Sequence, residues 1–188
     1  MMRQDPDIIL VGEIRDHITA EMALRAAMTG HQVFSTLHTN SAVGAIPRLL
    51  DIGILPDDIA GNLIGVVAQR LVRRLCPACK VRSEAGDLEK KLLGIPLAQP
   101  LTIYNPGGCE RCDHKGYKGR MSVIEILKIN GDMDDLISRR ASMREMLNTA
   151  KLHGFKPIAD DACMRVLDGT TSLEEISRVV DLTDRVTG

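Results

Sequence analysis

The chain has 188 residues, of which 24 are basic and 25 acidic, giving a formal net charge of −1. This balance disfavours a protein whose main partner is nucleic acid or an anionic membrane surface. Hydrophobic residues make up 44% of the sequence, but only two Phe, two Tyr and no Trp occur, so a core must be aliphatic. No apolar run approaches the roughly 18 residues of a membrane span, and no apolar leader is present. The sequence therefore predicts a cytoplasmic protein of one sizeable domain or two smaller units.

The segment before the first cysteine predicts an α/β fold. The short apolar run at 8–11 is typical of a strand buried on both faces of a parallel sheet. A helical pattern and a second strand follow, which together predict a βαβ unit. Pro47 should kink the next helix or mark its late start. The elements expected here are strand 8–11, helix 19–30, strand 32–37, helix 41–52, helix 56–68 and an extended segment at 69–75.

Periodicity is lost between residues 76 and 120, where glycine and proline recur and little core can form. A strand at 121–129 then leads into a helical part, in which Ser142 and Glu145 have the spacing of a capping box. The helices expected after it are 142–154, 158–169 and one beginning at 171–172. These patterns predict three parts: an α/β part at 1–75, a cysteine-bearing subdomain at 76–120 and a small helical bundle at 121–188.

Four cysteines form two CxxC pairs, and 29 residues (80–108) separate the pairs. Two such turns can bring four thiolates to one tetrahedral Zn²⁺, and the metal would stabilise a segment poor in core residues. Redox-active turns and disulfides are the alternatives, but no thioredoxin-like pattern or signal segment accompanies the cysteines. A zinc hydrolase is a further alternative, although four thiolates leave no open coordination position. The predicted ligands are Cys76, Cys79, Cys109 and Cys112, whereas Cys163 lies on an apolar helical stripe and is predicted to be core.

Glu13 and His38 come just after the two predicted parallel strands, at the edge where α/β sheets bind ligands. In phosphate-handling folds, an acid in this place acts on Mg²⁺ or orients the attacking water, and a histidine suits contact with a phosphate oxygen. The alternatives are a solvated Glu13 at a strand end and a His38 that caps the next helix. His31 could instead close the first helix by bonding a terminal carbonyl.

These residues stand in segments that resemble the traffic ATPases of type II secretion and type IV pilus assembly. The segment 3–16 looks like their Walker B motif, and 30–40 resembles their histidine box. The remaining similar segments are 68–76 at the end of the motor core, 108–127 around the second cysteine pair and 169–176 in the C-terminal helix. The four cysteines resemble those of the zinc-bearing secretion and assembly branch of the family. Retraction motors generally lack these cysteines.

The resemblance implies the C-terminal part of a RecA-like P-loop ATPase sheet, followed by a tetracysteine zinc subdomain and a small helical bundle. Glu13 would be the Walker B acid, with Arg15 and Asp16 bracing the motif, and His38, with His31, would report the γ-phosphate. ATP and Mg²⁺ would be the cofactors of the full-length protein beside structural Zn²⁺. The partners implied are further copies in a homo-hexamer and the inner-membrane platform and cytoplasmic-domain proteins of the machine, with the motor peripheral to the bacterial inner membrane through them.

No GxxxxGK[ST] phosphate loop occurs in these 188 residues, and the acidic box and upstream arginines of the family are also missing. We therefore expect the C-terminal segment of a motor, inactive in ATP hydrolysis by itself. The alternative is a stand-alone structural zinc module that binds nucleic acid or an acidic protein partner. Residues 70–120 carry eleven Lys or Arg against five Asp or Glu. However, few aromatic side chains are available for base stacking, which disfavours nucleic acid.

Overall fold

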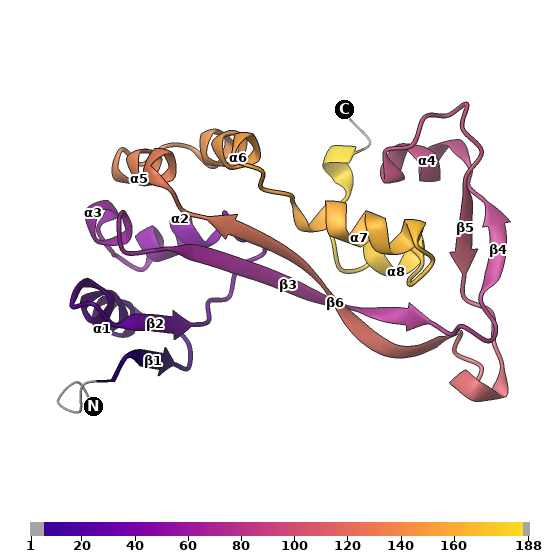
Figure 1. Cartoon of the computed structure of the whole chain (residues 1–188), viewed down its shortest axis with the longest axis horizontal. Coiled ribbons are helices and arrows are strands. Elements are labelled where there is room, and N and C mark those ends of the chain that lie inside the picture. The colour runs from indigo at the N-terminus through magenta and orange to yellow at the C-terminus, as the bar shows by residue number, and fades with distance from the viewer. Residues whose placement is uncertain (1–5, 186–188) are drawn as a thin grey trace. The chain divides into compact units, whose positions relative to one another are not determined.

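The computed structural model describes residues 6–185, apart from the side chain of Asp184. The beginning of the Walker B-like segment, Arg3 to Asp5, lies outside the described residues. The chain divides into two compact units, and Figure 1 labels their elements. Unit 1 holds the residues up to Ala68 together with Ile126–Phe155, and unit 2 holds Gln69–Glu125 with the residues from Lys156 onward.

The helices and strands alternate irregularly along the chain. In order they are β1 Ile8–Val11, α1 His17–Met28, β2 Gln32–Ser35, α2 Ala45–Asp51, α3 Pro56–Ile59, β3 Gly65–Leu75, β4 Val81–Glu84, α4 Asp87–Leu93, β5 Thr102–Asn105, η2 Glu110–Cys112, β6 Tyr117–Lys128, α5 Gly131–Ser138, α6 Met143–Leu152, α7 Ile158–Leu167, α8 Leu173–Ser177 and η3 Thr183–Arg185.

The predicted βαβ unit is confirmed in unit 1. Strands β1 and β2 pair in parallel, with Ile8 opposite Gln32 and Val11 opposite Ser35, and α1 connects them (Figure 1). The helix begins at His17 because the Asp16 carboxylate accepts the Thr19 N–H at 2.9 Å, a standard N-cap. The turn between β1 and α1 is therefore fixed close to the end of the strand.

The predicted burial of β1 on both faces is wrong for this chain. Ile8 is 60% exposed and Leu10 is 79% exposed. Among the described residues β1 pairs with β2 alone, so its other edge and part of its apolar surface meet no neighbouring strand. Such an edge is open to pairing with a further strand.

Two of the predicted helices in unit 1 need correction. The helix expected at 41–52 starts late, and Pro47 stands in the first turn of α2, where proline is tolerated. The helix expected at 56–68 is wrong, since α3 ends at Ile59 and β3 begins at Gly65. The backbone is already extended at Ala60, and Gly61 follows with φ +76°, so the helix does not continue. Unit 1 is also completed by α5, which the sequence patterns missed.

The core of unit 1 is aliphatic, as the composition predicts. Fully buried side chains come from α2, α3, α5, α6 and the end of β6; the largest are Ile46, Ile59, Leu127, Met133, Ile137 and Met146. The capping box of α6 is confirmed: the Ser142 hydroxyl accepts the Glu145 N–H at 3.3 Å, and the Glu145 carboxylate accepts the Ser142 N–H at 2.9 Å.

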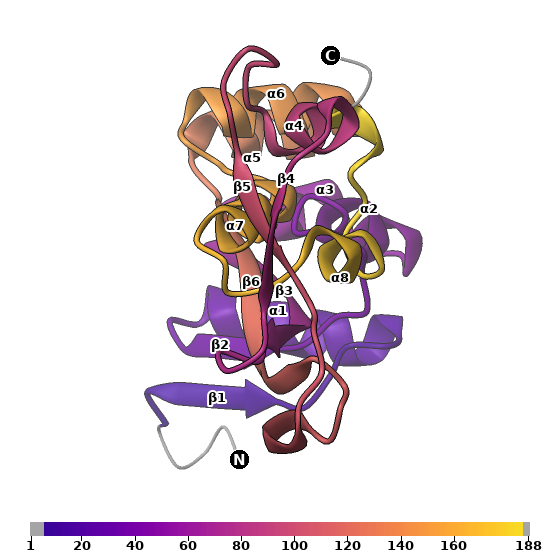
Figure 2. The same cartoon turned by 90° about the vertical axis from the view of Figure 1, so that its right-hand side faces the viewer.

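Unit 2 corrects the expectation of a core-poor excursion at 76–120. Strands β4 and β5 pair antiparallel, with Val81 opposite Asn105, and Figure 2 shows them side by side. Leu93 of α4 and Ile103 of β5 are buried in the same core as residues of α7 and α8. The segment therefore contributes its own share to the packing of unit 2. Cys163 of α7 is only 2% exposed, which confirms its place in the core.

The C-terminal helices belong to different units, with α5 and α6 in unit 1 and α7 and α8 in unit 2. The compact units thus differ from the three parts at 1–75, 76–120 and 121–188, because β3 and β6 each contribute residues to both units. That three-part division stays a prediction about where the functional segments begin and end.

Candidate functional site

The first cluster of functional side chains forms where β1 and β2 end. The Arg15 Nε donates to the Glu13 Oε2 at 2.7 Å, and the Nε2 of His38 lies 3.2 Å from the same oxygen. Glu13 follows β1 and His38 follows β2, so the parallel pairing brings the two side chains to one edge of the sheet. The structure therefore joins three of the residues that the sequence singled out.

Backbone contacts fix the two turns that carry this cluster. The Ile14 N–H donates to the Thr36 carbonyl at 2.9 Å, and the Thr36 hydroxyl donates to the Gly12 carbonyl at 2.8 Å. These bonds continue the pairing of β1 and β2 beyond the strands themselves. Thr36 was not among the predicted site residues, although its place before His38 is visible in the sequence. Its hydroxyl holds the turn from which Glu13 projects.

Arg15 reinforces the ionised form of Glu13. The hydrogen bond from its guanidinium holds the pKa of Glu13 below its usual value, and His38 adds to this effect. Glu13 is therefore a carboxylate throughout the neutral range, and it remains accessible to solvent. A carboxylate of this kind suits a role as a ligand or as an acceptor from water.

His31 lies away from this cluster. It precedes β2, whereas His38 follows it, so the two histidines stand at opposite ends of the strand. The His31 Nδ1 lies 3.1 Å from the Ala26 carbonyl and 3.0 Å from the Thr29 hydroxyl, both at the end of α1. The geometry favours the alternative that His31 closes the end of α1. Its ring lies at the end of β2 opposite to Glu13 and His38.

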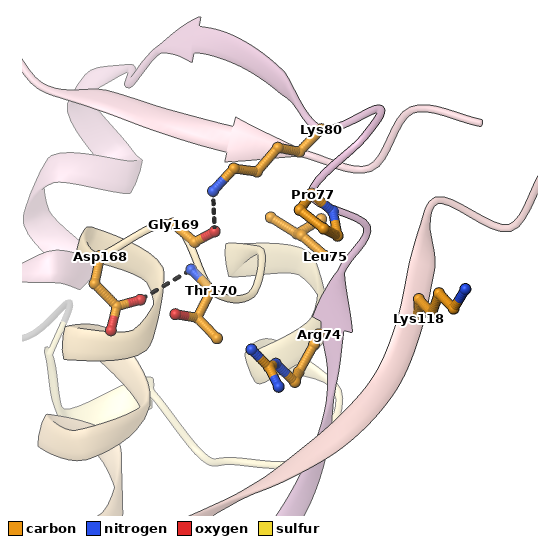
Figure 3. Close-up of a pocket in the computed structure, with 8 residues that line it drawn as sticks. All are labelled: Arg74, Leu75, Pro77, Lys80, Lys118, Asp168, Gly169 and Thr170. Atoms are coloured by element: carbon orange, nitrogen blue, oxygen red, sulfur yellow. Dashed lines mark hydrogen bonds between the residues drawn. The ribbon is translucent and has the colours of Figure 1, made fainter. Parts of the chain in front are cut away.

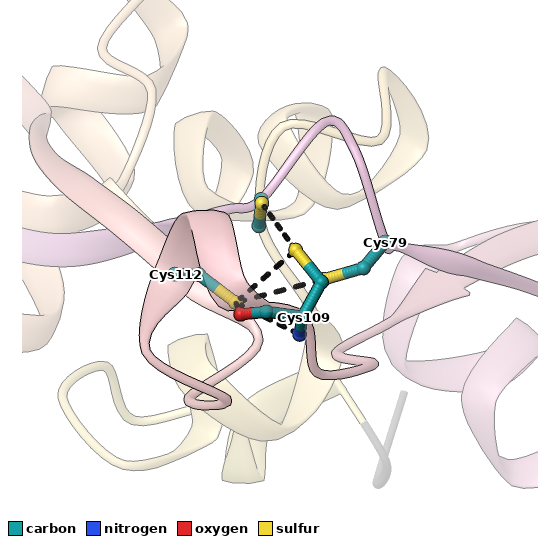
Figure 4. A group of neighbouring side chains, drawn as sticks. Cys79, Cys109 and Cys112 are labelled. Atoms are coloured by element: carbon teal, nitrogen blue, oxygen red, sulfur yellow. Dashed lines mark hydrogen bonds between the residues drawn. The ribbon is translucent and has the colours of Figure 1, made fainter.

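The second cluster unites the four predicted cysteines. Their sulfur atoms all lie within 4.8 Å of one another, and Figure 4 shows those of Cys79, Cys109 and Cys112 turned toward a common centre. The Sγ atoms of Cys76 and Cys109 are 3.9 Å apart, and those of Cys79 and Cys112 are 3.7 Å apart. A tetrahedron with metal–sulfur bonds of about 2.3 Å has edges of about 3.8 Å. These distances fit one zinc ion, and they are far too long for disulfide bonds of about 2.05 Å.

Backbone donors prepare one of these thiols for ionisation. Burial raises the pKa of Cys112, but its sulfur accepts N–H groups from Cys109 at 3.4 Å and Gly116 at 3.3 Å, and the pKa falls to about 6. Burial and hydrogen bonds among the thiols raise the pKa of Cys79 to about 12. The first thiolate thus forms at Cys112. A cation that binds there must displace the protons of the other thiols, so metal affinity falls as the pH falls.

A glycine allows the two cysteine turns to approach each other. A Cβ placed on Gly107 would lie 2.1 Å from the carbonyl oxygen of Cys79, a distance that no side chain can occupy without moving the backbone. Gly107 precedes Cys109 by two residues, so any shift is passed directly to a ligand.

We expect Gly107→Ala to weaken zinc binding at least tenfold, because the added methyl group drives the two turns apart. Competition with a chromophoric chelator measures this affinity. Gly131→Ala is the matched control, since a Cβ at Gly131 meets nothing within 4 Å and should leave the affinity unchanged. Equal zinc affinity in the Gly107→Ala variant would show that this close approach does not position the ligands.

A polar network that the sequence patterns missed holds the strands next to the cysteines. Both the main-chain N–H and the guanidinium of Arg73 donate to Glu175 of α8, at 2.9 Å for the main-chain bond and 2.8 Å for Nε. The Arg73 guanidinium also stacks 4.1 Å from the centre of the Tyr117 ring, whose hydroxyl lies 2.7 Å from the Ser172 hydroxyl. Arg73 precedes the first cysteine pair and Tyr117 follows the second, so α8 braces both strands that flank the cluster.

Comparison with known proteins assigns the chain to a family. Residues 1–178 match the family described as "Type II/IV secretion system protein". The chain belongs to this family. The sequence-based resemblance to secretion and pilus-assembly ATPases is thereby confirmed.

Several members of the type II/IV secretion family are similar to the chain over most of its length. The type IV pilus assembly ATPase TfpB of Acinetobacter baylyi is 47% identical over 97% of the chain and 32% of its own length. The type II secretion system protein E of Pseudomonas aeruginosa is 48% identical over 95% of the chain and 36% of its own length. The chain therefore spans about a third of the length of these relatives.

Two solved structures of the ATPase DotB share the fold. The Legionella pneumophila protein aligns with a TM-score of 0.61 over 95% of the chain and 39% of its own length, at 21% identity. The Yersinia pseudotuberculosis protein aligns with a TM-score of 0.64 over 98% of the chain and 38% of its own length, at 20% identity. The chain thus has the α/β architecture of part of an ATPase of this kind. Within residues 6–185, every helix is too short or too polar to cross a bilayer.

Proposed function

We propose that the chain is the C-terminal segment of a hexameric ATPase motor that powers type II protein secretion or type IV pilus assembly. The observation that carries the proposal is the cluster of Glu13, Arg15 and His38 at the carboxyl edge of a parallel strand pair in a member of this family. An ionised carboxylate in this place has the charge and exposure that a Walker B acid needs.

The roles of the three side chains follow from their contacts. When bound, ATP would supply the phosphoryl group, and Mg²⁺ would neutralise part of its negative charge. Glu13 would contact the water molecules bound to the metal and orient the attacking water. Arg15 donates to the Glu13 carboxylate, which lowers its pKa and would hold its orientation. His38 contacts the same carboxylate oxygen of Glu13. If His38 contacts the γ-phosphate, a movement of its ring would change this contact with Glu13.

Zinc is the metal we propose for the four cysteines, and its role is structural. The sulfur separations support tetrahedral coordination, and four thiolates leave no position at which water could be activated. Cys76 directly follows β3 and Cys112 lies shortly before β6, so the metal would tie together two parts of unit 2 that are distant in sequence.

The further partners follow from the family. We propose a homo-hexamer in the cytoplasm that is peripheral to the inner membrane through platform and cytoplasmic-domain proteins of the machine. The exposed apolar strand β1 supports a larger sheet, because a further strand would cover Ile8 and Leu10. Such a strand would come from a part of the full-length protein that corresponds to the portion of the relatives not matched by this chain.

The 188 residues alone are expected to show no ATP hydrolysis, because they include no phosphate loop. Joined to the upstream segment of the Pseudomonas aeruginosa relative, the chain is expected to gain hydrolysis, and Glu13→Gln is expected to reduce kcat about 100-fold. His31→Ala is the control and should leave kcat unchanged, because its ring bonds the end of α1. Azide-insensitive hydrolysis by the isolated chain that Glu13→Gln abolishes would contradict the proposed inactivity; an unchanged kcat in the joined Glu13→Gln protein would contradict the role of Glu13.

A further inference from the structure

Unit 2 contains a pocket of about 340 Å³ beside the first cysteine pair, outside both clusters described above. Figure 3 shows how its walls come from the end of β3, the first CxxC turn, the beginning of β6 and the turn between α7 and α8. Its lining residues are Arg74, Leu75, Pro77, Lys80, Lys118, Asp168, Gly169 and Thr170. The volume lies at the lower end of the range for small ligands and short peptide segments.

Three cations and one carboxylate line this pocket. Lys80 is fixed, since its Nζ donates to the Gly169 carbonyl at 2.8 Å and lies 4.2 Å from the centre of the Tyr104 ring. Arg74 and Lys118 are exposed, and neither forms an ion pair within residues 6–185. The two side chains extend from the neighbouring strands β3 and β6 (Figure 3). The rim is thus positive, with two charges available for a ligand.

The pocket is poorly suited to a phosphate group. Phosphate sites commonly use free backbone N–H groups, but here the Leu75 N–H donates to the Thr170 carbonyl at 2.8 Å. The Thr170 N–H donates to the Asp168 carboxylate at 2.9 Å.

Nucleic acid is disfavoured as well. None of the eight lining residues is aromatic, so the pocket offers no platform on which a base could stack. Pro77 and Leu75 instead provide an apolar wall next to the charges. A ligand that fits carries carboxylates for the cations, N–H donors for Asp168 and some apolar surface, and a peptide rich in aspartate or glutamate has all three.

We propose that this pocket is the docking site for an acidic segment of a protein partner. Carboxylates of the segment contact the guanidinium of Arg74 and the Nζ of Lys118, while a main-chain N–H donates to Asp168. Lys80 shapes the floor by holding the Gly169 carbonyl in place. The site is separate from Glu13 and His38, so the proposal is independent of the ATPase function.

The test uses the zinc-loaded chain and a fluorescein-labelled peptide of alternating glutamate and alanine, with binding followed by anisotropy at low ionic strength. The same peptide with glutamine in place of glutamate should not bind. Reversing both free charges, in the double variant R74E/K118E, is expected to weaken binding about tenfold, since each reversal turns an attraction into a repulsion.

The matched control is R144E/K151E, which changes the net charge equally at exposed positions of α6 in unit 1. Its affinity for the peptide should stay within twofold of the wild type. Unchanged zinc content and tyrosine circular dichroism show that R74E/K118E is folded. Equal weakening in both double variants would overturn the proposal, because binding would then follow net charge alone. The proposal would also be overturned if the glutamate peptide did not bind. It would be overturned as well if inorganic phosphate, oligothymidine or phosphatidylglycerol vesicles bound more tightly than the peptide through Arg74 and Lys118.

Discussion

Cys109→Ser is expected to abolish zinc binding and to unfold unit 2. Structural zinc contributes about 10–16 kcal/mol in small domains, as much as or more than the 5–15 kcal/mol net stability of typical proteins. A serine hydroxyl does not replace the thiolate, and the two turns then lose the centre that joins them. Zinc content is measured by mass spectrometry, and folding by near-ultraviolet circular dichroism. Both tyrosines of the chain, Tyr104 and Tyr117, lie in unit 2, so their signal reports this unit.

Cys163→Ala is the matched control for this experiment. Cys163 is buried in the core of unit 2, away from the four clustered cysteines, and its replacement removes a sulfur without removing a ligand. We expect this variant to retain one zinc per chain and to lose only about 1–2 kcal/mol of stability from the small cavity. A Cys109→Ser protein that loses zinc but keeps its tyrosine signal and melting temperature would show that the metal is not structural.

The parts of the site that the sequence predicted are those whose determinants are local. The spacing within each CxxC turn brings its own two sulfurs together, so a four-sulfur site requires only that the two turns come close to each other. The Glu13 and His38 cluster follows from a general rule, because parallel strands present their carboxyl ends at one edge. His31 could not be placed in this way, since a histidine after a helix is equally suited to its C-terminus, where the structure has it.

The fold was less predictable where short elements follow one another. Apolar residues at 63–68 fit a helix as well as a strand, and only the positive φ of Gly61 and the pairing of β3 with β6 decide between them. Between residues 76 and 120, β4, β5 and α4 are each too short to show periodicity. Their burial depends on a core assembled from α7 and α8, far along the chain.

The contact between Glu175 and Arg73, next to the cysteine cluster, could not be predicted from the sequence either. They are 102 residues apart in sequence, and a glutamate in the first turn of a helix is ordinarily a solvated residue. Here Glu175 is 5% exposed and its carboxylate accepts both main-chain and side-chain donors of Arg73. Because a buried charge without such a partner is strongly unfavourable, the pair is more important than its sequence context suggests.

Glu175→Gln is expected to destabilise unit 2 by about 2–3 kcal/mol, somewhat less than the 3–5 kcal/mol lost on breaking a fully buried pair. The smaller value follows from the Arg73 side chain, which is 39% exposed and keeps part of its hydration. Urea unfolding followed by tyrosine fluorescence measures the loss. Asp113→Asn, which removes the exposed pair with Lys115 in the same unit, is the control and should cost less than about 0.5 kcal/mol. A loss of similar size in both variants would mean that burial adds nothing to the Arg73 pair.

The pH dependence of this difference identifies the group responsible. Burial alone would raise the pKa of Glu175, but the hydrogen bonds from Arg73 outweigh it and hold the pKa below its usual value. A carboxyl group whose pKa is lowered by folding stabilises the protein fully above its unfolded pKa of about 4.3, and this stabilisation is lost as the pH falls through the lower folded value. The stability difference between wild type and Glu175→Gln should therefore stay constant between about pH 6 and 8, where the group is ionised in both states. A difference that changes across this window would assign the effect to a group other than Glu175.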